Sequence, residues 1–289
     1  MNWLLSPLTW LIEYFQSVTG SYAAAIVLFT LAVKICLTPL DYKQRNSMRR
    51  MNKLQPEIEK INARYANDPD KRAQKTMALY KKEKCSPFAS CLPMLIQLPI
   101  LFAMVSVMNR LAYDGIMRMF LDAYETGTLQ LESFLWVHNI FQPDNISAQV
   151  LPSLEEILPQ LQRYSSDIIN EETLALFEAN YMSVIQPTLD QFSGYANGWA
   201  ILPILSGALQ FLQTKLMPAA PAADEKAKQN SKMMNYMFPI MSFFFCLSFN
   251  AAFALYWVAS SLLGIAQNLV MNQYFKYLDA KESKGVLIS

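Results

Sequence analysis

Long apolar stretches separated by charged segments dominate the pattern of the chain. A helix needs about 20 predominantly apolar residues to cross a bilayer. Five stretches approach or exceed that length: residues 21–40, 88–111, 199–217, 233–249 and 251–275. Only Asn250 separates the last two, so we expect them to form a tight hairpin. The pattern therefore predicts an all-α integral membrane protein built on a bundle of five transmembrane helices.

The segments between these spans differ sharply in charge. Residues 41–87, the basic segment, contain 13 Lys and Arg against six Asp and Glu, whereas residues 112–198, the acidic segment, contain two against 12. Cytoplasmic loops carry the excess of Lys and Arg, and residues 1–20 contain neither. We therefore expect the N-terminus outside and, after five crossings, the loop 218–232 and the tail 276–289 inside. The N-terminus also lacks the basic region and cleavage site of a secretory signal.

Residues 2–18 show the pattern of an amphipathic helix. Ser6, Thr9, Glu13 and Gln16 share one predicted face, opposite Leu4, Leu8, Leu11 and Phe15. The segment is too short and too polar on one side to span a bilayer. We expect segment 1–20 to lie in the outer interface, with Trp3 and Trp10 at the level of the headgroups.

The basic segment is expected to form a cytoplasmic helical hairpin. Asp68 precedes Pro69 in a turn, which is typical of an N-cap followed by the first residue of a helix. Pro56 should kink the first helix near its middle. Two apolar stripes should face each other: Met48, Met51, Leu54, Ile58, Ile61 and Tyr65 on the first helix, and Ala73, Met77 and Tyr80 on the second.

The acidic segment is expected to be an extracytoplasmic helical insert. Residues 154–169 and 171–185 have helical patterns, and Pro159 and Pro187 are expected to be breaks. The single histidine, His138, lies here without neighbours that suggest chemistry.

Lys34 lies within the first apolar span. A charged group at the centre of a membrane helix costs about 2.5–3.5 kcal/mol on insertion scales, and such groups face protein or water. No Asp or Glu lies in any of the other spans to pair with it. Lys34 therefore indicates a wet recess inside the membrane.

Each span contributes a polar residue at a similar depth. At 1.5 Å per helical residue, they lie roughly 9–13 Å from the cytoplasmic ends of the spans. The residues are Lys34, Gln97, Gln210, Ser242 and Gln267, and Thr30 shares the face of Lys34. Their clustering favours a hydrophilic groove open to the cytoplasm and closed on the outside. The alternative is that Ser, Thr and Gln only join the helices by hydrogen bonds.

The composition gives no support for an enzyme. The eight glycines form no phosphate-binding loop, and one histidine with four dispersed cysteines provides neither a metal cluster nor a nucleophile–base pair. We expect no cofactor and no metal. A transporter or channel for small anionic solutes, with Lys34 as the binding cation, is the alternative functional class.

Several strings resemble the signatures of YidC-type membrane protein insertases of the Oxa/Alb/YidC superfamily. Residues 30–40 (TLAVKICLTPL) and 54–58 (LQPEI) are similar to the first block of that family. Residues 91–100 (CLPMLIQLPI) resemble its second-span signature. Residues 201–207 (ILPILSG) and 249–257 (FNAAFALYW) resemble the third and the fifth.

The resemblance implies a function: insertion and folding of membrane proteins in a bacterial plasma membrane. It implies a groove open to the cytoplasm and to lipid, and it adds Trp257 to the groove residues Lys34, Thr30, Gln97, Gln210 and Gln267. The family usually has an arginine where this chain has Lys34, so the charge persists without the guanidinium fork. The implied partners are nascent membrane proteins and lipids, with the Sec translocon, the ribosome and the signal recognition pathway as further candidates. We expect the chain to act as a monomer.

Overall fold

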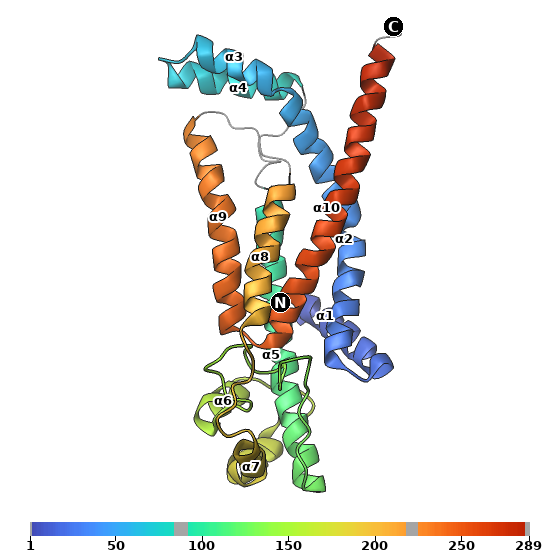
Figure 1. Cartoon of the computed structure of the whole chain (residues 1–289), viewed down its shortest axis with the longest axis vertical. Helices are drawn as coiled ribbons and strands as arrows, with labels where there is room; N and C mark the ends of the chain where they lie inside the picture. The colour runs from blue at the N-terminus through green and yellow to red at the C-terminus, as the bar shows by residue number, and fades with distance from the viewer. Residues whose placement is uncertain (1, 84–91, 218–224, 287–289) are drawn as a thin grey trace. The chain divides into compact units, whose positions relative to one another are not determined.

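A computed structural model describes residues 2–83, 92–217 and 225–286 of the chain. The described residues form ten α-helices, and their single β-type feature is an isolated bridge between Phe134 and Val137. The helices are α1 (Asn2–Thr19), α2 (Tyr22–Lys53), α3 (Gln55–Arg64), α4 (Pro69–Lys82), α5 (Leu92–Thr126), α6 (Leu154–Gln162), α7 (Glu171–Gln191), α8 (Ile201–Leu216), α9 (Glu225–Ser248) and α10 (Ala251–Val286) (Figure 1). The predicted all-α fold class is therefore confirmed for this part of the chain.

The predicted spans fall on α2, α5, α8, α9 and α10. Three helical stretches among the described residues are long and apolar enough to cross a membrane: Tyr22–Lys53, Leu98–Thr126 and Ala251–Lys281. By contrast, α8 has 16 residues, and Asn235–Ser248 within α9 is a shorter apolar stretch of the described residues. The expected start of the second span at Phe88, with Cys85 and Cys91, lies outside the described residues.

The helices continue beyond the ends of the predicted spans. The first span was expected to end at Leu40, but α2 runs on to Lys53, and α10 runs past Phe275 to Val286. Residues 41–53 contain neither Gly nor Pro, so nothing interrupts the backbone hydrogen bonds. The loss of hydropathy marks a change of environment and not the end of a helix.

The chain divides into two compact units. Unit 1 consists of Met1–Leu31, Leu101–Gly207 and Met241–Ser260, and unit 2 of Ala32–Ile100, Ala208–Ile240 and Ser261–Ser289. The five helices on which the predicted spans fall are divided between the units, and each contributes one part to unit 1 and one part to unit 2.

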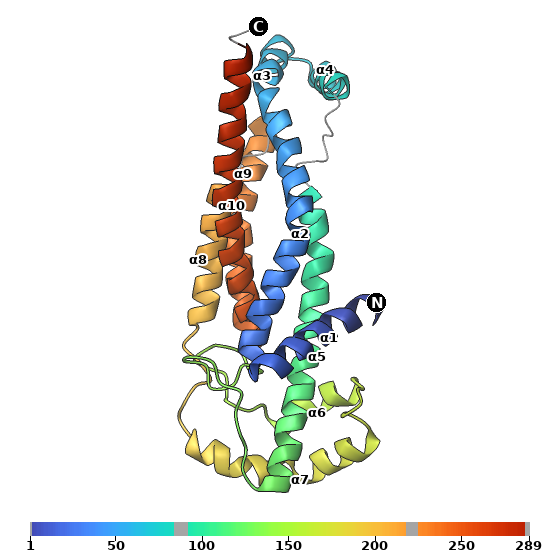
Figure 2. The ribbon, with the colours of Figure 1, turned by 90° about the vertical axis from the view of Figure 1, so that its right-hand side faces the viewer.

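Aromatic packing joins α5 to α7 in unit 1. The ring of Phe177 lies 4.9 Å from that of Phe120 and 4.4 Å from that of Tyr181, between ring centroids. The Tyr181 hydroxyl donates to the Pro152 carbonyl at 2.8 Å. Helix α7 crosses beside the end of α5 (Figure 2). Burial of each such ring contributes about 1.5–3 kcal/mol.

Two prolines predicted as breaks lie inside helices of unit 1. Pro159 lies inside α6 and Pro187 inside α7. Helix α7 buries Phe177, Tyr181 and Ile185 along one face, and this packing outweighs the backbone hydrogen bond lost at Pro187. Both helices begin at capping boxes, which Ser153 forms with Glu156 in α6 and Asn170 forms with Thr173 in α7.

The buried face of α1 differs from the prediction. Leu5 and Ile12 are buried, whereas the predicted apolar residues Leu8, Leu11 and Phe15 are only partly buried. Trp10 and Tyr14 stack on each other and remain exposed. Helix α1 therefore has one apolar surface that packs on protein and one aromatic surface that remains exposed.

Helices α3 and α4 pack against each other in unit 2, and we call this pair the hairpin (Figure 2). Asp68 is the N-cap of α4 and accepts from the Lys71 amide at 3.0 Å, and Pro69 is the first helical residue. Near Pro56 the helix ends completely, because Leu54 separates α2 from α3. The hairpin core comprises Met51, Ile58, Leu79 and Tyr80. The predicted stripe of α4 was partly wrong, since Met77 is exposed and Leu79 is buried.

Candidate functional site

Lys34 lies on α2 in unit 2, where its side chain is partly buried. The Thr38 hydroxyl donates to the Lys34 backbone carbonyl at 2.8 Å. Asp41 and Arg45 follow on the same helical face, because the spacings of four, three and four residues return to one side of an α-helix. We call Lys34, Thr38, Asp41 and Arg45 the polar track of α2.

Helix α10 supplies the partners of the polar track. The Gln267 amide nitrogen donates to Asp41 Oδ2 at 3.0 Å and to Thr38 Oγ1 at 3.3 Å. One turn further on, Arg45 Nη1 donates to Asn272 Oδ1 at 3.3 Å, and the Asn272 amide nitrogen donates to the Leu216 carbonyl at 2.9 Å. Asn272 therefore links α2, α10 and the last turn of α8.

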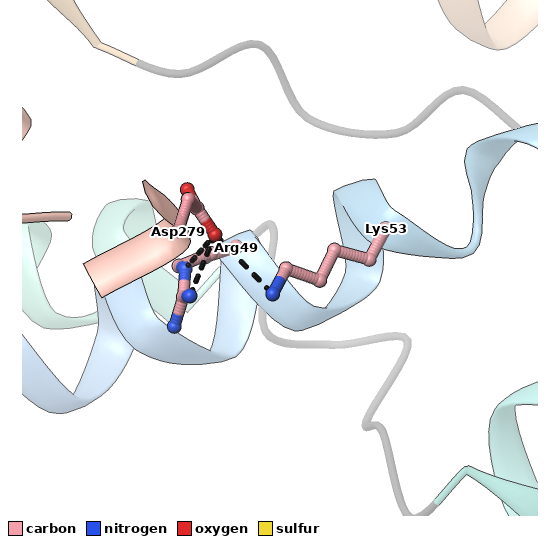
Figure 3. A network of polar contacts seen from close by, with 3 residues as sticks. All are labelled: Arg49, Lys53 and Asp279. Carbon is pink, nitrogen blue, oxygen red and sulfur yellow. Dashed lines mark hydrogen bonds and ion pairs between the residues drawn. The ribbon is translucent and has the colours of Figure 1, made fainter. Parts of the chain in front are cut away.

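An ion pair continues this contact beyond the polar track. Asp279 Oδ1 accepts from Arg49 Nη2 at 2.6 Å and from Arg49 Nε at 2.9 Å, and lies 3.2 Å from Lys53 Nζ. Figure 3 shows both cations of α2 pointing to this one carboxylate of α10. Arg49 also lies over the Phe275 ring, with its guanidinium carbon 5.9 Å from the centroid. The end of α2 that leads into the hairpin is thus attached to α10.

The polar track carries net positive charge. Asp41 interacts electrostatically with both Lys34 and Arg45, so one carboxylate is shared between two cations. We expected no carboxylate near Lys34, because Asp41 was counted with the basic segment. The continuation of α2 past Leu40 places Asp41 two turns from Lys34 on the same face. A net cationic strip of this kind can attract an anionic group without chemical transformation.

The predicted groove residues are divided between the two units. Lys34, Gln210 and Gln267 lie in unit 2, and the latter two are partly buried. Gln97 belongs to α5 in unit 2, but its side chain lies outside the described residues. Thr30 and Trp257 lie in unit 1 and are buried.

Two of the residues expected at groove depth are engaged in helix contacts of unit 1. The Thr30 hydroxyl donates to the Ile26 carbonyl of its own helix at 2.6 Å. Ser242 is buried and its hydroxyl donates to Ser206 Oγ at 3.3 Å. These contacts agree with the alternative, in which hydroxyl groups join or satisfy helices.

Sequence reasoning missed Asn268. Its side chain is 4% exposed, and its amide nitrogen has no hydrogen-bond partner among the described residues. Gly264 and Asn272, one turn to either side on α10, contact α8 through Gln213 and the Leu216 carbonyl. The spacing of 264, 268 and 272 was the available signal, since residues four apart share a helical face.

Within the described residues, no group of three His, Cys, Asp or Glu side chains is arranged to hold a metal ion.

Comparison with known proteins identifies the family. Residues 14–280 match the family model described as 60Kd inner membrane protein. The chain belongs to this family. Its relatives include a protein called membrane protein insertase YidC from Fusobacterium nucleatum subsp. nucleatum, 30% identical over 275 residues that cover 95% of both chains. The predicted resemblance to YidC-type insertases is confirmed.

Longer members of the YidC family also match. The membrane protein insertase YidC of Shewanella frigidimarina is 31% identical over 270 residues, which cover 93% of this chain and 36% of that protein. This chain therefore spans about a third of the Shewanella relatives and nearly all of the Fusobacterium one. A crystal structure described as an active YidC insertase with the first transmembrane domain resolved matches with a TM-score of 0.49 and 22% identity, covering 92% of this chain and 45% of that one.

Proposed function

We propose that this chain inserts membrane proteins into the bilayer and assists their folding. The family match over residues 14–280 is the observation that carries the proposal. The chain also covers 95% of a relative named as a membrane protein insertase, which supports the proposal. The substrates are nascent membrane proteins.

We infer that α2, α5, α8, α9 and α10 all cross the membrane, with the N-terminus outside and the C-terminus inside. The three long apolar helices support three crossings directly by their length and composition. The opposite charges of the basic and acidic segments support the orientation, because Lys and Arg are retained on the cytoplasmic side. We propose a bacterial plasma membrane as the location, which the family description as an inner membrane protein supports.

The proposed working surface is a hydrophilic groove around Lys34. Polar or acidic segments of a client cross hydrocarbon at high cost. A cation part of the way into the membrane shortens the dry path and stabilises an acidic client residue. The membrane potential, positive outside, favours outward movement of that negative charge. The apolar helix of the client then moves into lipid, and no nucleotide hydrolysis is required.

Two residues beyond the predicted groove set belong to this proposal. Asp41 balances part of the charge of Lys34 and Arg45, and the buried amide of Asn268 offers a donor for water or for a client backbone. Trp257 and Thr30 remain proposed groove residues on the basis of the family resemblance and the pattern alone.

The hairpin α3–α4 is the proposed receiving surface for clients on the cytoplasmic side. Its exposed Met77 offers an adaptable apolar contact, whereas Met48 and Met51 are buried. The Sec translocon, the ribosome and the signal recognition pathway are proposed partners, and the chain is proposed to act as a monomer.

Substitution of Lys34 tests the proposal. In cells depleted of their own insertase, we expect Lys34→Arg to support growth and insertion of clients with acidic outer segments, because the role requires charge and not one donor geometry. Lys34→Ala and Lys34→Glu should fail. The matched control is Lys43→Ala, an exposed lysine on the same helix.

Full insertion by Lys34→Ala would contradict the cationic groove. Lys34-dependent flux of small anions through proteoliposomes, without any effect on client insertion, would identify the alternative class of transporter or channel.

A further inference from the structure

A buried carboxylate organises the loops of the acidic segment in unit 1. Asp144 is fully buried and accepts three hydrogen bonds: from the Leu202 amide at 2.7 Å, the Ala200 amide at 3.0 Å and Trp136 Nε1 at 3.2 Å. Two of these donors are at the start of α8, where amide groups lack intrahelical acceptors. Asp144 therefore holds two loops against the first turn of α8.

Both loops contain backbone strain at this point. Leu135 (φ 52°) and Ala200 (φ 59°) are the only described residues other than glycine with positive φ. L-residues with side chains rarely adopt this conformation. Leu135 precedes Trp136, and its turn is closed by reciprocal backbone hydrogen bonds of 2.9 Å between Phe134 and Val137. Strain of this kind persists only where surrounding contacts enforce it.

Three large apolar side chains project from these loops. Leu135 is 75% exposed, Ile146 74% and Trp199 70%, and each lies within two residues of Asp144 or of a group that bonds to it. We call these three residues the apolar rim. At Leu135 a rarely adopted backbone conformation presents an apolar side chain to water, and burial of any of the three rim side chains in a nonpolar environment would be favourable.

The apolar rim lies near the starts of α8 and α10. The Ala251 and Ala252 amides, which begin the apolar stretch Ala251–Lys281, donate to the carbonyls of Gln142 and Ile140 at 2.9 and 2.8 Å. The same loop continues through Asp144 to Ile146, and Trp199 lies two residues before the first turn of α8. Tryptophan at the end of a span favours the boundary between headgroups and acyl chains.

We propose that the apolar rim inserts into the lipid leaflet on the side of the acidic segment, and that Asp144 is the positioning residue that holds it there. The rim carries no charge, and the segment around it is acidic, so contact through apolar side chains suits a lipid surface without electrostatic attraction. The proposal requires only that α10 spans the membrane and does not depend on the insertase function.

Quenching of single fluorescent labels tests the lipid contact. In a variant with Cys36, Cys85, Cys91 and Cys246 replaced by serine, single cysteines at Leu135, Ile146 or Trp199 carry an environment-sensitive dye. The protein is placed in phosphatidylcholine nanodiscs. Lipid with a nitroxide near the headgroup should quench these labels several-fold more strongly than a label at Met182, an exposed apolar residue of α7. Aqueous iodide should show the opposite order.

Two results would overturn the lipid contact. If iodide quenches the rim labels as strongly as the Met182 label, the rim lies in water. If neither quencher reaches the rim labels, protein such as a second copy of the chain covers them.

The role of Asp144 is tested with the same labels. In Asp144→Asn, an amide NH2 group replaces one carboxylate oxygen and faces other hydrogen-bond donors. Quenching of the rim labels by lipid should therefore fall, whereas quenching of the Met182 label should stay unchanged. Asp167→Asn, the same change at an exposed carboxylate of the acidic segment, should leave all labels unchanged. Unchanged rim quenching in Asp144→Asn would overturn the positioning role.

Discussion

At the scale of single residues, burial decides what a polar group does in this chain. Arg45 and Asp144 are both more than nine-tenths buried, and each is held by hydrogen bonds that connect different elements. Such groups are expensive to bury unless they are bonded. Lys34 is only partly buried and shares Asp41 with Arg45. Arg45 and Asp144 thus stabilise the fold, whereas the more exposed Lys34 is the residue proposed to meet a client.

Burial raises the pKa of the Glu132 carboxyl in the acidic segment. A folded-state pKa above the unfolded value means that stability is fully present below the unfolded pKa and is lost as the pH rises through the folded pKa. We therefore expect Glu132→Gln to raise the unfolding temperature at neutral pH. The advantage should vanish below pH of about 4, where both states of the parent are protonated.

Thermal unfolding followed at several pH values in detergent measures this effect, with exposed Glu178→Gln as the matched control. An advantage that grows as the pH falls would contradict desolvation as the cause.

At the scale of elements, a small apolar core holds α3 and α4 together. Polar contacts with α10 hold the end of α2 that leads into the hairpin. Ile58 is fully buried in the hairpin, whereas Met77 on the facing helix is exposed. The hairpin therefore has a packed interior and a free apolar surface.

Replacing Ile58 should open the hairpin. An isoleucine-to-alanine change in a core costs about 2–5 kcal/mol. We expect Ile58→Ala to accelerate amide hydrogen exchange throughout α4 and to reduce crosslinking to clients. Met77→Ala should leave exchange unchanged, because it removes no core contact. Normal client crosslinking in Ile58→Ala would show that clients bypass the hairpin.

The contact of Arg49 with Asp279 is partly exposed, with 14% and 48% side-chain exposure. Exposed ion pairs contribute about 0.2–1 kcal/mol. A double-mutant cycle of Arg49→Gln and Asp279→Asn should therefore give a coupling of about that size. Hydrogen exchange of the amides of residues 276–281 is the readout, and Lys281→Gln is the control. A coupling of zero would mean that Lys53 alone engages Asp279.

At the scale of the whole molecule, the proposed orientation in the membrane rests on the charge asymmetry of the chain. The basic segment and the acidic segment differ in the sign of their net charge, and the second predicted span, residues 88–111, separates them in the sequence. The positive-inside rule converts this difference into an orientation.

Labelling of single cysteines in intact cells tests the orientation. A cysteine at Met182, in the acidic segment, should react with a membrane-impermeant thiol reagent added outside. A cysteine at Lys75, exposed on α4, should react only after the cells are opened. The same cysteine-free background serves both variants. The reverse order of reactivity would invert the proposed topology.

The sequence determined the local features of this protein, since they depend on neighbouring residues. Apolar runs predicted the long helices, Asp68 and Pro69 predicted the start of α4, and the signature strings predicted the family. The prediction was wrong where neighbours were insufficient: packing of Phe177 and Tyr181 kept α7 helical through Pro187.

Only the tertiary structure decided which polar groups meet. Gln267 bonds to Asp41 across 226 residues of sequence, and Arg45 bonds to Asn272 across 227. The spacing of polar residues indicated which of them share a face of one helix, but it could not predict which helices contact each other. The sequence did not predict the apolar rim either, because Leu135 and Trp199 are far apart in the chain. They are brought together in the structure by the hydrogen bonds that Asp144 accepts from Trp136 and Ala200. Such contacts arise from packing of distant segments, which no local pattern of residues encodes.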